Sequence, residues 1–299
     1  DPHQQLKKAK KLNGKKKGHK KKKKRSGGGG GGGITNWNFI HEVCGNKLVT
    51  LEIVQHLLEV FPDAASKFCT NRLRIIRDYI ADPDDASEKQ GCAYPLHIAC
   101  FNNDCPSSVI ELLVGKNAEA LRHRCNFGLP SPDDPSETAW YDGGLPLHCY
   151  LSRMSRDIKE DKVVWGQNKS NIDLAVVEML VNAYQNALMA TNDAKQTPLH
   201  IILQNEHTNA FPLDIVRFFT ASAEPASLLA LDWHGRTPLH STCGHKHVPF
   251  EAIELILQKQ PAALKCKDSY SSTPMHNFCY DNEVGEKSSL DVVKLFIQI

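Results

Sequence analysis

The sequence lacks several features that would place it in a common functional class. It has no apolar run of the roughly eighteen residues that a membrane-crossing helix needs, and no apolar stretch near its start resembles a signal peptide. Its 10 cysteines lack the close, regular spacing of a disulfide framework. We therefore expect reduced thiols in a cytoplasmic or nuclear protein without a membrane span.

Motifs of common catalytic sites are also missing. We find no Gly-rich phosphate loop, no Gly-x-Ser-x-Gly elbow and no His-Glu-x-x-His. A run of glycines extends from Gly27 to Gly33, but it lacks the Lys-Ser/Thr and the flanking strand of a phosphate loop. We expect no catalysis, no cofactor and no small-molecule substrate.

Positive charge is concentrated at the start of the chain. Residues 1–33 hold 13 of the 36 basic residues and 1 of the 34 acidic ones, so this segment carries +12 (13 − 1) and the remainder −10 (23 − 33). Such a polar segment cannot join a core, and we predict a disordered Lys-rich arm and Gly linker. One run has the density of a nuclear import signal or an anionic-surface tether, the alternative being an uncommitted tail. It comprises Lys20, Lys21, Lys22, Lys23, Lys24 and Arg25.

A short motif recurs along the rest of the chain. A Thr that caps the free amides of a helix, followed by Pro at the first helical position, is a helix start, and the Leu after it points inward. The copies are Tyr94-Pro95-Leu96-His97, Leu145-Pro146-Leu147-His148, Thr197-Pro198-Leu199-His200, Thr237-Pro238-Leu239-His240 and Thr273-Pro274-Met275-His276, preceded by a degenerate Asn38-Phe39-Ile40-His41.

An apolar hexamer follows each copy. Its bulky residues at positions one, two, five and six lie on one side of a second helix. Eleven residues after the start of the first five hexamers stands an alanine, which suggests a close backbone approach. The hexamers are Ile53–Leu58, Val109–Val114, Val176–Val181, Ile215–Thr220, Ala252–Leu257 and Val292–Ile297, and the alanines are Ala64, Ala120, Ala187, Ala226 and Ala263.

These residues resemble the ankyrin-repeat family. Thr-Pro-Leu-His is complete in two copies, and the segment 232–236 resembles that family's turn between repeats. The resemblance implies an all-α, ankyrin-like α-solenoid of about six helix-turn-helix repeats, since a single pair cannot bury its own apolar face. The domain would span residues 34–299, with repeats at about 34–69, 91–125, 142–192, 194–231, 234–268 and 270–299.

The spacing departs from that family's regular period. Successive motif histidines from His41 onward lie 56, 51, 52, 40 and 36 residues apart. We attribute the excess to loop insertions at residues 70–90, 126–140 and 152–170, with an extra short helix at Leu73–Ile80.

A metal site is the main chemical alternative, because His-x-x-Cys recurs in four copies. One pair per repeat places the pairs about a repeat apart, whereas zinc needs four converging ligands. We therefore expect no metal and predict that the motif histidines hydrogen-bond backbone groups at the turns. The tightest cluster is His240, Cys243, His245 and His247.

Recognition of a protein partner is the leading functional hypothesis. The resemblance implies contact through a concave side formed by turn tips and first helices. The alternative is a nucleic-acid-associated protein, in which nucleic acid binds through the basic arm alone and affinity falls steeply with salt. Candidate contact residues in the turns are Lys195, Gln196, Trp233, His234, Arg236, Ser269 and Tyr270.

The last predicted helix has no neighbour after it. The sequence stops at Ile299, inside the sixth apolar segment. Because a solenoid normally ends in a polar cap, we expect the natural protein to continue and this chain to associate or fray at its apolar end.

Overall fold

The structure, a computed structural model, describes residues 38–69, 93–126, 143–153, 155–157, 162–164, 172–204, 211–245, 248–281 and 287–299. The chain divides into two units, residues 1–35 and 36–299, and every described residue belongs to the second. The basic arm, the import run, the insertion at 70–90, the expected helix at Leu73–Ile80 and nearly all of 126–140 lie outside the described residues.

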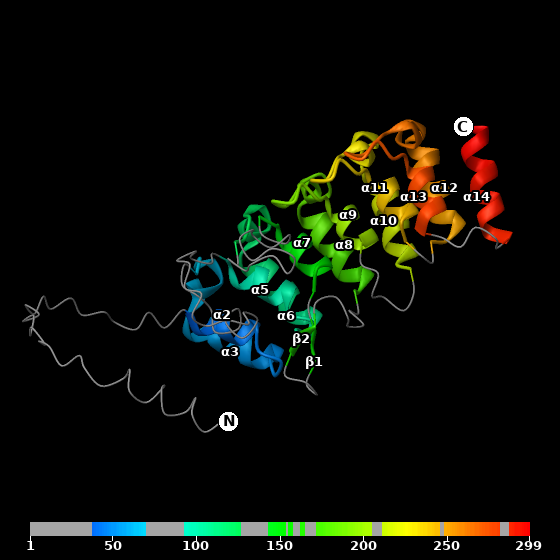
Figure 1. The fold of residues 1–299 in the computed structure, drawn as a ribbon. Coiled ribbons are helices and arrows are strands. Elements are labelled where there is room, and N and C mark those ends of the chain that lie inside the picture. The colour runs from blue at the N-terminus through cyan, green and yellow to red at the C-terminus, as the bar shows by residue number, and fades with distance from the viewer. Residues whose placement is uncertain are drawn as a thin grey trace, which may run out of the picture. The chain divides into compact units, whose positions relative to one another are not determined.

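Each motif copy lies in a short first helix, and each hexamer lies in a second helix (Figure 1). The expectation of an all-α fold built from helix pairs is confirmed. The pairs are α2 (Asn38–Cys44) with α3 (Leu51–Val60), α5 (Pro95–Phe101) with α6 (Ser107–Lys116), α7 (Pro146–Leu151) with α8 (Leu174–Ala183), α9 (Pro198–Gln204) with α10 (Leu213–Ser222), α11 (Pro238–Cys243) with α12 (Phe250–Lys259), and α13 (Pro274–Asp281) with α14 (Lys287–Gln298).

One element was not predicted. Residues 152–170 were expected to form only a loop, but they contain a short antiparallel hairpin of β1 (Ser155–Asp157) and β2 (Lys162–Val164). Three residues per strand are too few for an alternation of apolar and polar side chains to stand out in the sequence.

The helix pairs follow one another in a row (Figure 1). First helices contact first helices in the order α2, α5, α7, α9, α11 and α13. Second helices do the same in the order α3, α6, α8, α10, α12 and α14. Each pair therefore buries its apolar surface against the pairs before and after it.

The burial of the hexamers shows which residues face which neighbour. In α12, positions one, two, five and six are all buried. In α3, which has no described pair before it, Ile53 at position one is 45% exposed while Val54 and Leu58, at positions two and six, are buried. In α14, which has none after it, Ile297 at position six is 75% exposed. Positions one and five thus face the preceding pair, and positions two and six the following one.

A 3-10 turn follows each of the first five second helices. The expected buried alanine occupies this turn in four cases, but Ala226 is exposed and Ser227 takes its place. The turn in this repeat begins one residue later, and the Ser227 hydroxyl donates to the carbonyl oxygen of Glu224 at 2.7 Å. The turns are η1 (Pro62–Ser66), η2 (Ala118–Arg122), η3 (Gln185–Leu188), η4 (Pro225–Leu229) and η5 (Pro261–Lys265).

The burial pattern predicts unequal costs for truncation at the same hexamer position. Leu257→Ala, where the side chain is 1% exposed, should lower the free energy of unfolding by about 2–5 kcal/mol. Ile297→Ala should change it by less than about 0.5 kcal/mol. Urea denaturation followed by circular dichroism at low protein concentration measures both. Equal losses would contradict the assignment of position six to the following repeat.

Candidate functional site

Three turns of the same construction precede α9, α11 and α13. The first side chain of each turn accepts a hydrogen bond from the backbone N–H four residues later, at 2.8 Å in every case. This Asx-type bond fixes the turn before the helix starts. The pairs are Asn192 with Gln196, Asp232 with Arg236, and Asp268 with Ser272.

The fourth residue of each turn has a left-handed backbone. The φ angles are +58° at Lys195, +72° at Gly235 and +64° at Ser271. Glycine adopts this conformation without penalty, whereas Lys and Ser each pay about 1–2 kcal/mol. A Cβ at Gly235 would also lie 3.0 Å from the backbone nitrogen of Ser269. The turn shape therefore persists even where the sequence disfavours it.

Neighbouring turns are joined to each other through their backbones. The N–H of Trp233 donates to the carbonyl oxygen of Ala194 at 3.0 Å, and the N–H of Ser269 donates to that of His234 at 2.9 Å. The side chains at the turn tips therefore project from backbone segments that are hydrogen-bonded to one another.

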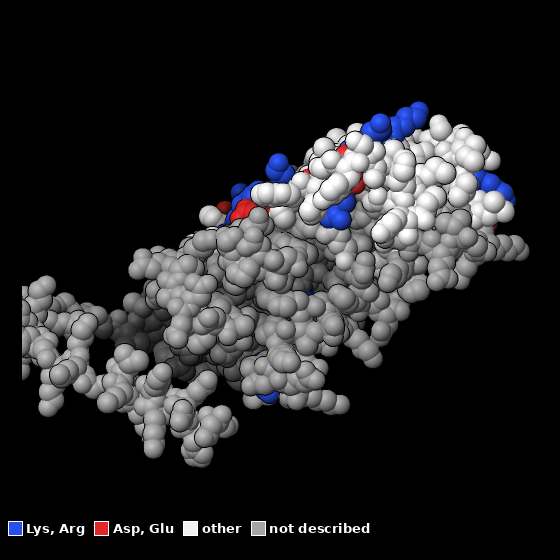
Figure 2. Space-filling view, in the orientation of Figure 1, with Lys and Arg blue, Asp and Glu red and all other residues white. Residues whose placement is uncertain are grey.

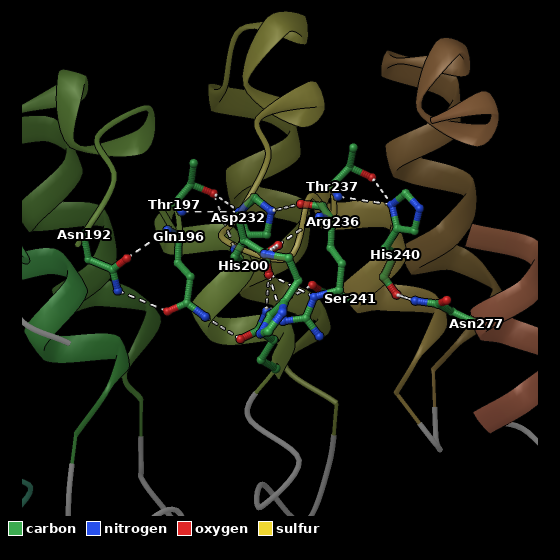
Figure 3. Close-up of polar contacts among 12 residues, drawn as sticks. Asn192, Gln196, Thr197, His200, Asp232, Arg236, Thr237, His240, Ser241 and Asn277 are labelled. Carbon is green, nitrogen blue, oxygen red and sulfur yellow. Dashed lines mark hydrogen bonds and ion pairs between the residues drawn. The ribbon is translucent and has the colours of Figure 1, made fainter. Parts of the chain in front are cut away.

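The motif histidines connect each first helix to the chain segment that leads to the next repeat (Figure 3). The Nδ1 of His240 accepts from the backbone N–H of Thr237 at 3.1 Å and lies 2.8 Å from its hydroxyl, while Nε2 lies 3.1 Å from the carbonyl oxygen of Ser272. Because a carbonyl can only accept, Nε2 carries the proton and the ring is neutral.

The same arrangement recurs in the three preceding copies, at His97, His148 and His200. In the last copy, Nδ1 of His276 accepts from the backbone N–H of Thr273, and the ring is exposed. The predicted hydrogen bonds to the backbone are therefore confirmed. The Nε2 contacts are His97 with the carbonyl oxygen of His123 (2.7 Å), His148 with Ala190 (3.0 Å) and His200 with Arg236 (3.0 Å), and His41 of the degenerate copy contacts Lys67 (3.0 Å).

Burial makes these imidazoles weak bases. Loss of hydration lowers the pKa of His97, His148 and His200 to about 4 and shifts the pKa of His240 in the same direction. A ring that is neutral, buried and bonded at both nitrogens cannot accept a substrate proton near neutral pH.

Three of the four cysteines of the His-x-x-Cys pairs are buried and in unreactive surroundings, whereas Cys279 is exposed. Burial raises the pKa of the Cys44, Cys100 and Cys243 thiols above the ordinary value, and it raises that of Cys105 to about 12. Among the described residues, no three His, Cys, Asp or Glu side chains converge to hold a metal ion. Of the tightest cluster, His247 lies outside the described residues, and both ring nitrogens of His240 already have hydrogen-bond partners.

Most of the predicted contact residues project from the turn tips. Trp233 is 63% exposed and Tyr270 is 76% exposed. The side chains of Lys195, His234 and Ser269 are exposed as well. These five residues form what we call the turn ledge. Figure 2 shows Lys and Arg side chains along the upper edge of the described surface, with acidic side chains between some of them.

Two of the predicted contact residues turn inward instead. The Gln196 side chain is buried, where it accepts from the amide of Asn192 at 3.1 Å and donates to Gln204 at 2.5 Å. The half-buried guanidinium of Arg236 binds the carboxylate of Asp232, with Nε 2.9 Å from Oδ2. Both occupy the fifth turn position, whose side chain points back toward the helices.

These residues belong to a polar network that the sequence did not reveal (Figure 3). Gln204 donates to Asp232 at 3.3 Å and to Ser241 at 3.4 Å, so the network links three consecutive repeats. Burial alone would raise the pKa of Asp232, but its hydrogen bonds with Arg236 and that residue's charge outweigh it and hold the pKa below the usual value. In the sequence, the spacing of four residues between Asp232 and Arg236 was the signal that could have indicated this pairing.

The first helices contribute less surface than expected. Every residue of α5, α7 and α11 is buried, so these helices do not offer side chains to a partner in the way that the family resemblance implied. In the middle repeats, exposed candidates come from the turns.

Comparisons with known proteins leave the function open. No protein-family model matches the chain, and no curated protein matches it. Solved structures that match include a chain from a complex of a predatory endopeptidase from Bdellovibrio bacteriovorus with an immunity protein, with 14% identity, a TM-score of 0.48 and coverage of 85% of this chain and 96% of that one. A likeness this distant assigns no activity. In the described part of the chain, no helix is long and apolar enough to span a membrane.

The buried histidines predict a loss of stability in mild acid. Their pKa is about 4 in the folded chain for His97, His148 and His200, against about 6.5 when unfolded. The unfolded chain therefore binds more protons between these values, and the free energy of unfolding falls as the pH drops from 6.5 toward 4. Urea denaturation at pH 7, 6 and 5 measures the slope.

A matched pair of variants isolates the histidine contribution. His200→Gln should reduce the pH slope by up to one proton, worth about 1.4 kcal/mol per pH unit. The control Gln55→Ala replaces an exposed side chain of α3 that does not titrate, and it should leave the slope unchanged. A free energy of unfolding that stays constant between pH 7 and 5 would show that the buried motif histidines are not held in the neutral form by the fold.

Proposed function

We propose that this chain is an ankyrin-type repeat module that binds a protein partner through the turn ledge and catalyses no reaction itself. The observation that carries the proposal is the exposure of two aromatic side chains in consecutive turns. Trp233 and Tyr270 stand on turns whose backbones are hydrogen-bonded through His234 and Ser269. The motif residues and the helix-pair order support the family assignment.

The energetics favour a protein surface as the ligand of the ledge. Each large aromatic side chain brings about 150–250 Å² of surface, at about 25 cal/mol per Å² removed from water. Trp and Tyr are enriched among the residues that dominate binding energy. Because the turns are already fixed by hydrogen bonds, little ordering entropy is lost when a partner covers them.

The chemistry of the interior supports a binding role over a catalytic one. The histidines of four motif copies are neutral and bonded at both ring nitrogens, and burial raises the pKa of the Cys44, Cys100 and Cys243 thiols, so neither set supplies an activated base or nucleophile. The Asp232 carboxylate and the Arg236 guanidinium likewise bind each other within the chain.

Partner capture with matched variants tests the proposal. The double variant Trp233→Ala/Tyr270→Ala should lose partners that the unmodified chain retains, with affinity reduced at least tenfold, which corresponds to about 1.4 kcal/mol or more. The control variant Val60→Ala/Met189→Ala removes exposed apolar side chains elsewhere and should retain them. Capture of the same proteins with equal affinity by all three chains would refute the turn ledge as the binding surface.

A further inference from the structure

The turn that precedes α7 has the same frame as the three turns before α9, α11 and α13, although the segment 126–142 is inserted into it. The N–H of Cys125 donates to the carbonyl oxygen of Gly144 at 2.8 Å, which is the bond that joins the first and fifth positions of the other turns. Gly143, at the fourth position, has a left-handed φ of +72°. Cys125 therefore occupies the first turn position. In the other turns that position holds Asn192, Asp232 or Asp268.

Cysteine cannot close this turn in the way that Asn and Asp close the others. An amide or carboxylate oxygen accepts firmly from a backbone N–H, whereas the sulfur of a thiol is a weak acceptor. The Cys125 sulfur instead lies 3.4 Å from the sulfur of Cys149 in α7. Cys149 stands one helical turn after Leu145, to whose carbonyl oxygen its N–H donates at 3.1 Å. The contact between the two sulfurs thus joins the start of the turn to the helix that follows it.

The two sulfur atoms lie near bonding distance. A disulfide has an S–S length of about 2.05 Å, so the pair must close by about 1.4 Å (3.4 − 2.05). Both residues are free thiols, and their exposed fractions are 1% for Cys125 and 0% for Cys149. Only a small reagent can therefore reach them in the folded chain.

The two thiols differ in how they can meet such a reagent. Cys125 lies between the exposed residues Arg124 and Asn126, on a turn that two backbone hydrogen bonds close. Cys149 lies in α7, every residue of which is buried. Local opening costs less free energy at a turn than inside a packed helix. Cys125 is therefore the thiol that meets the reagent first, and Cys149 is the thiol that reacts with the product.

We propose that Cys125 and Cys149 form a reversible disulfide when the chain meets hydrogen peroxide, and that the dithiol is the resting form. The peroxide O–O bond breaks as it oxidises the Cys125 thiol to a sulfenic acid, and one water is released. The Cys149 thiolate then attacks the Cys125 sulfur, so that the S–S bond forms and the S–O bond breaks. The departing hydroxide takes the proton that the Cys149 thiol has lost and leaves as a second water. The two thiols together lose two hydrogen atoms, and the peroxide is reduced.

The disulfide closes the turn before α7 covalently. It links residues that lie 24 positions apart in the sequence, and it holds the two sides of the turn together when their hydrogen bonds break. The N–H groups of Cys125 and Gly143 make the two backbone hydrogen bonds of this turn. Both should therefore exchange with solvent more slowly in the oxidised chain. This turn lies outside the turn ledge, so the effect does not depend on what the ledge binds.

Mass spectrometry of the 299-residue chain after mild treatment with hydrogen peroxide tests the pairing. Remaining thiols are alkylated in denaturant before digestion. We expect a linked pair of peptides that contain Cys125 and Cys149, lighter than the two separate peptides by two hydrogen atoms, and dithiothreitol should separate them. The control Cys266→Ser removes a half-buried thiol elsewhere in the chain and should form the same link. A treated chain in which Cys125 and Cys149 are both alkylated, or in which Cys125 is linked to another cysteine such as Cys100, overturns the proposal.

Serine variants test the order of the two steps. In Cys149→Ser, the sulfenic acid at Cys125 has no thiol to react with, so a dimedone reagent should trap it there. In Cys125→Ser, the same treatment should trap nothing at Cys149, and circular dichroism checks that both variants are folded. Trapping at Cys149 but not at Cys125 contradicts the proposed order.

Hydrogen exchange of the unmodified chain tests the consequence. Oxidation should slow the exchange of the Cys125 and Gly143 amides at least about tenfold. The same treatment of Cys149→Ser should leave both rates unchanged. If both amides of the unmodified chain exchange at the same rate before and after the link has formed, the disulfide does not close this turn.

Discussion

The fold depends on histidines that are bonded at both ring nitrogens in four of the six repeats. One nitrogen holds the start of the first helix and the other holds the chain that leads to the next repeat. Such a ring must be neutral and in a single tautomer, because a second ring proton would face a backbone N–H that also donates. Burial favours the neutral state by lowering the pKa of the ring. One side chain therefore stabilises both the start of the first helix and the contact with the next repeat.

The exposed surface follows from this arrangement. Since the histidines and the Asx-type bonds fix the turns, the side chains at the second and third positions of the turns before α11 and α13 are left exposed. Trp233 and Tyr270 occupy these positions, whereas the first and fifth positions are occupied by the polar network of Asp232 and Arg236. The same turn thus separates structural side chains from those proposed to meet a partner.

Structural features that recur in every repeat could be predicted from the sequence, whereas features that occur in a single repeat were missed. The motif and the hexamer recur in six copies, so helix pairs, their order and the histidine hydrogen bonds could be inferred. Gln196 was wrongly placed at the surface and Arg236 is partly buried against Asp232, because polarity alone does not show that an internal partner is available. Ala226 was misplaced because counting from the hexamer cannot detect a turn that begins one residue later.

The protonation state of the motif histidines decides whether these rings bridge neighbouring repeats in neutral form. Two-dimensional ¹H–¹⁵N correlation spectra that connect ring protons to both nitrogens identify the tautomer of each ring. We expect Nε2-protonated, neutral rings for His97, His148, His200 and His240 at pH 7, with the same signals retained by the folded chain at pH 5.5. Rings protonated at Nδ1, or rings that titrate near pH 6.5 like those of exposed histidines, would contradict this expectation.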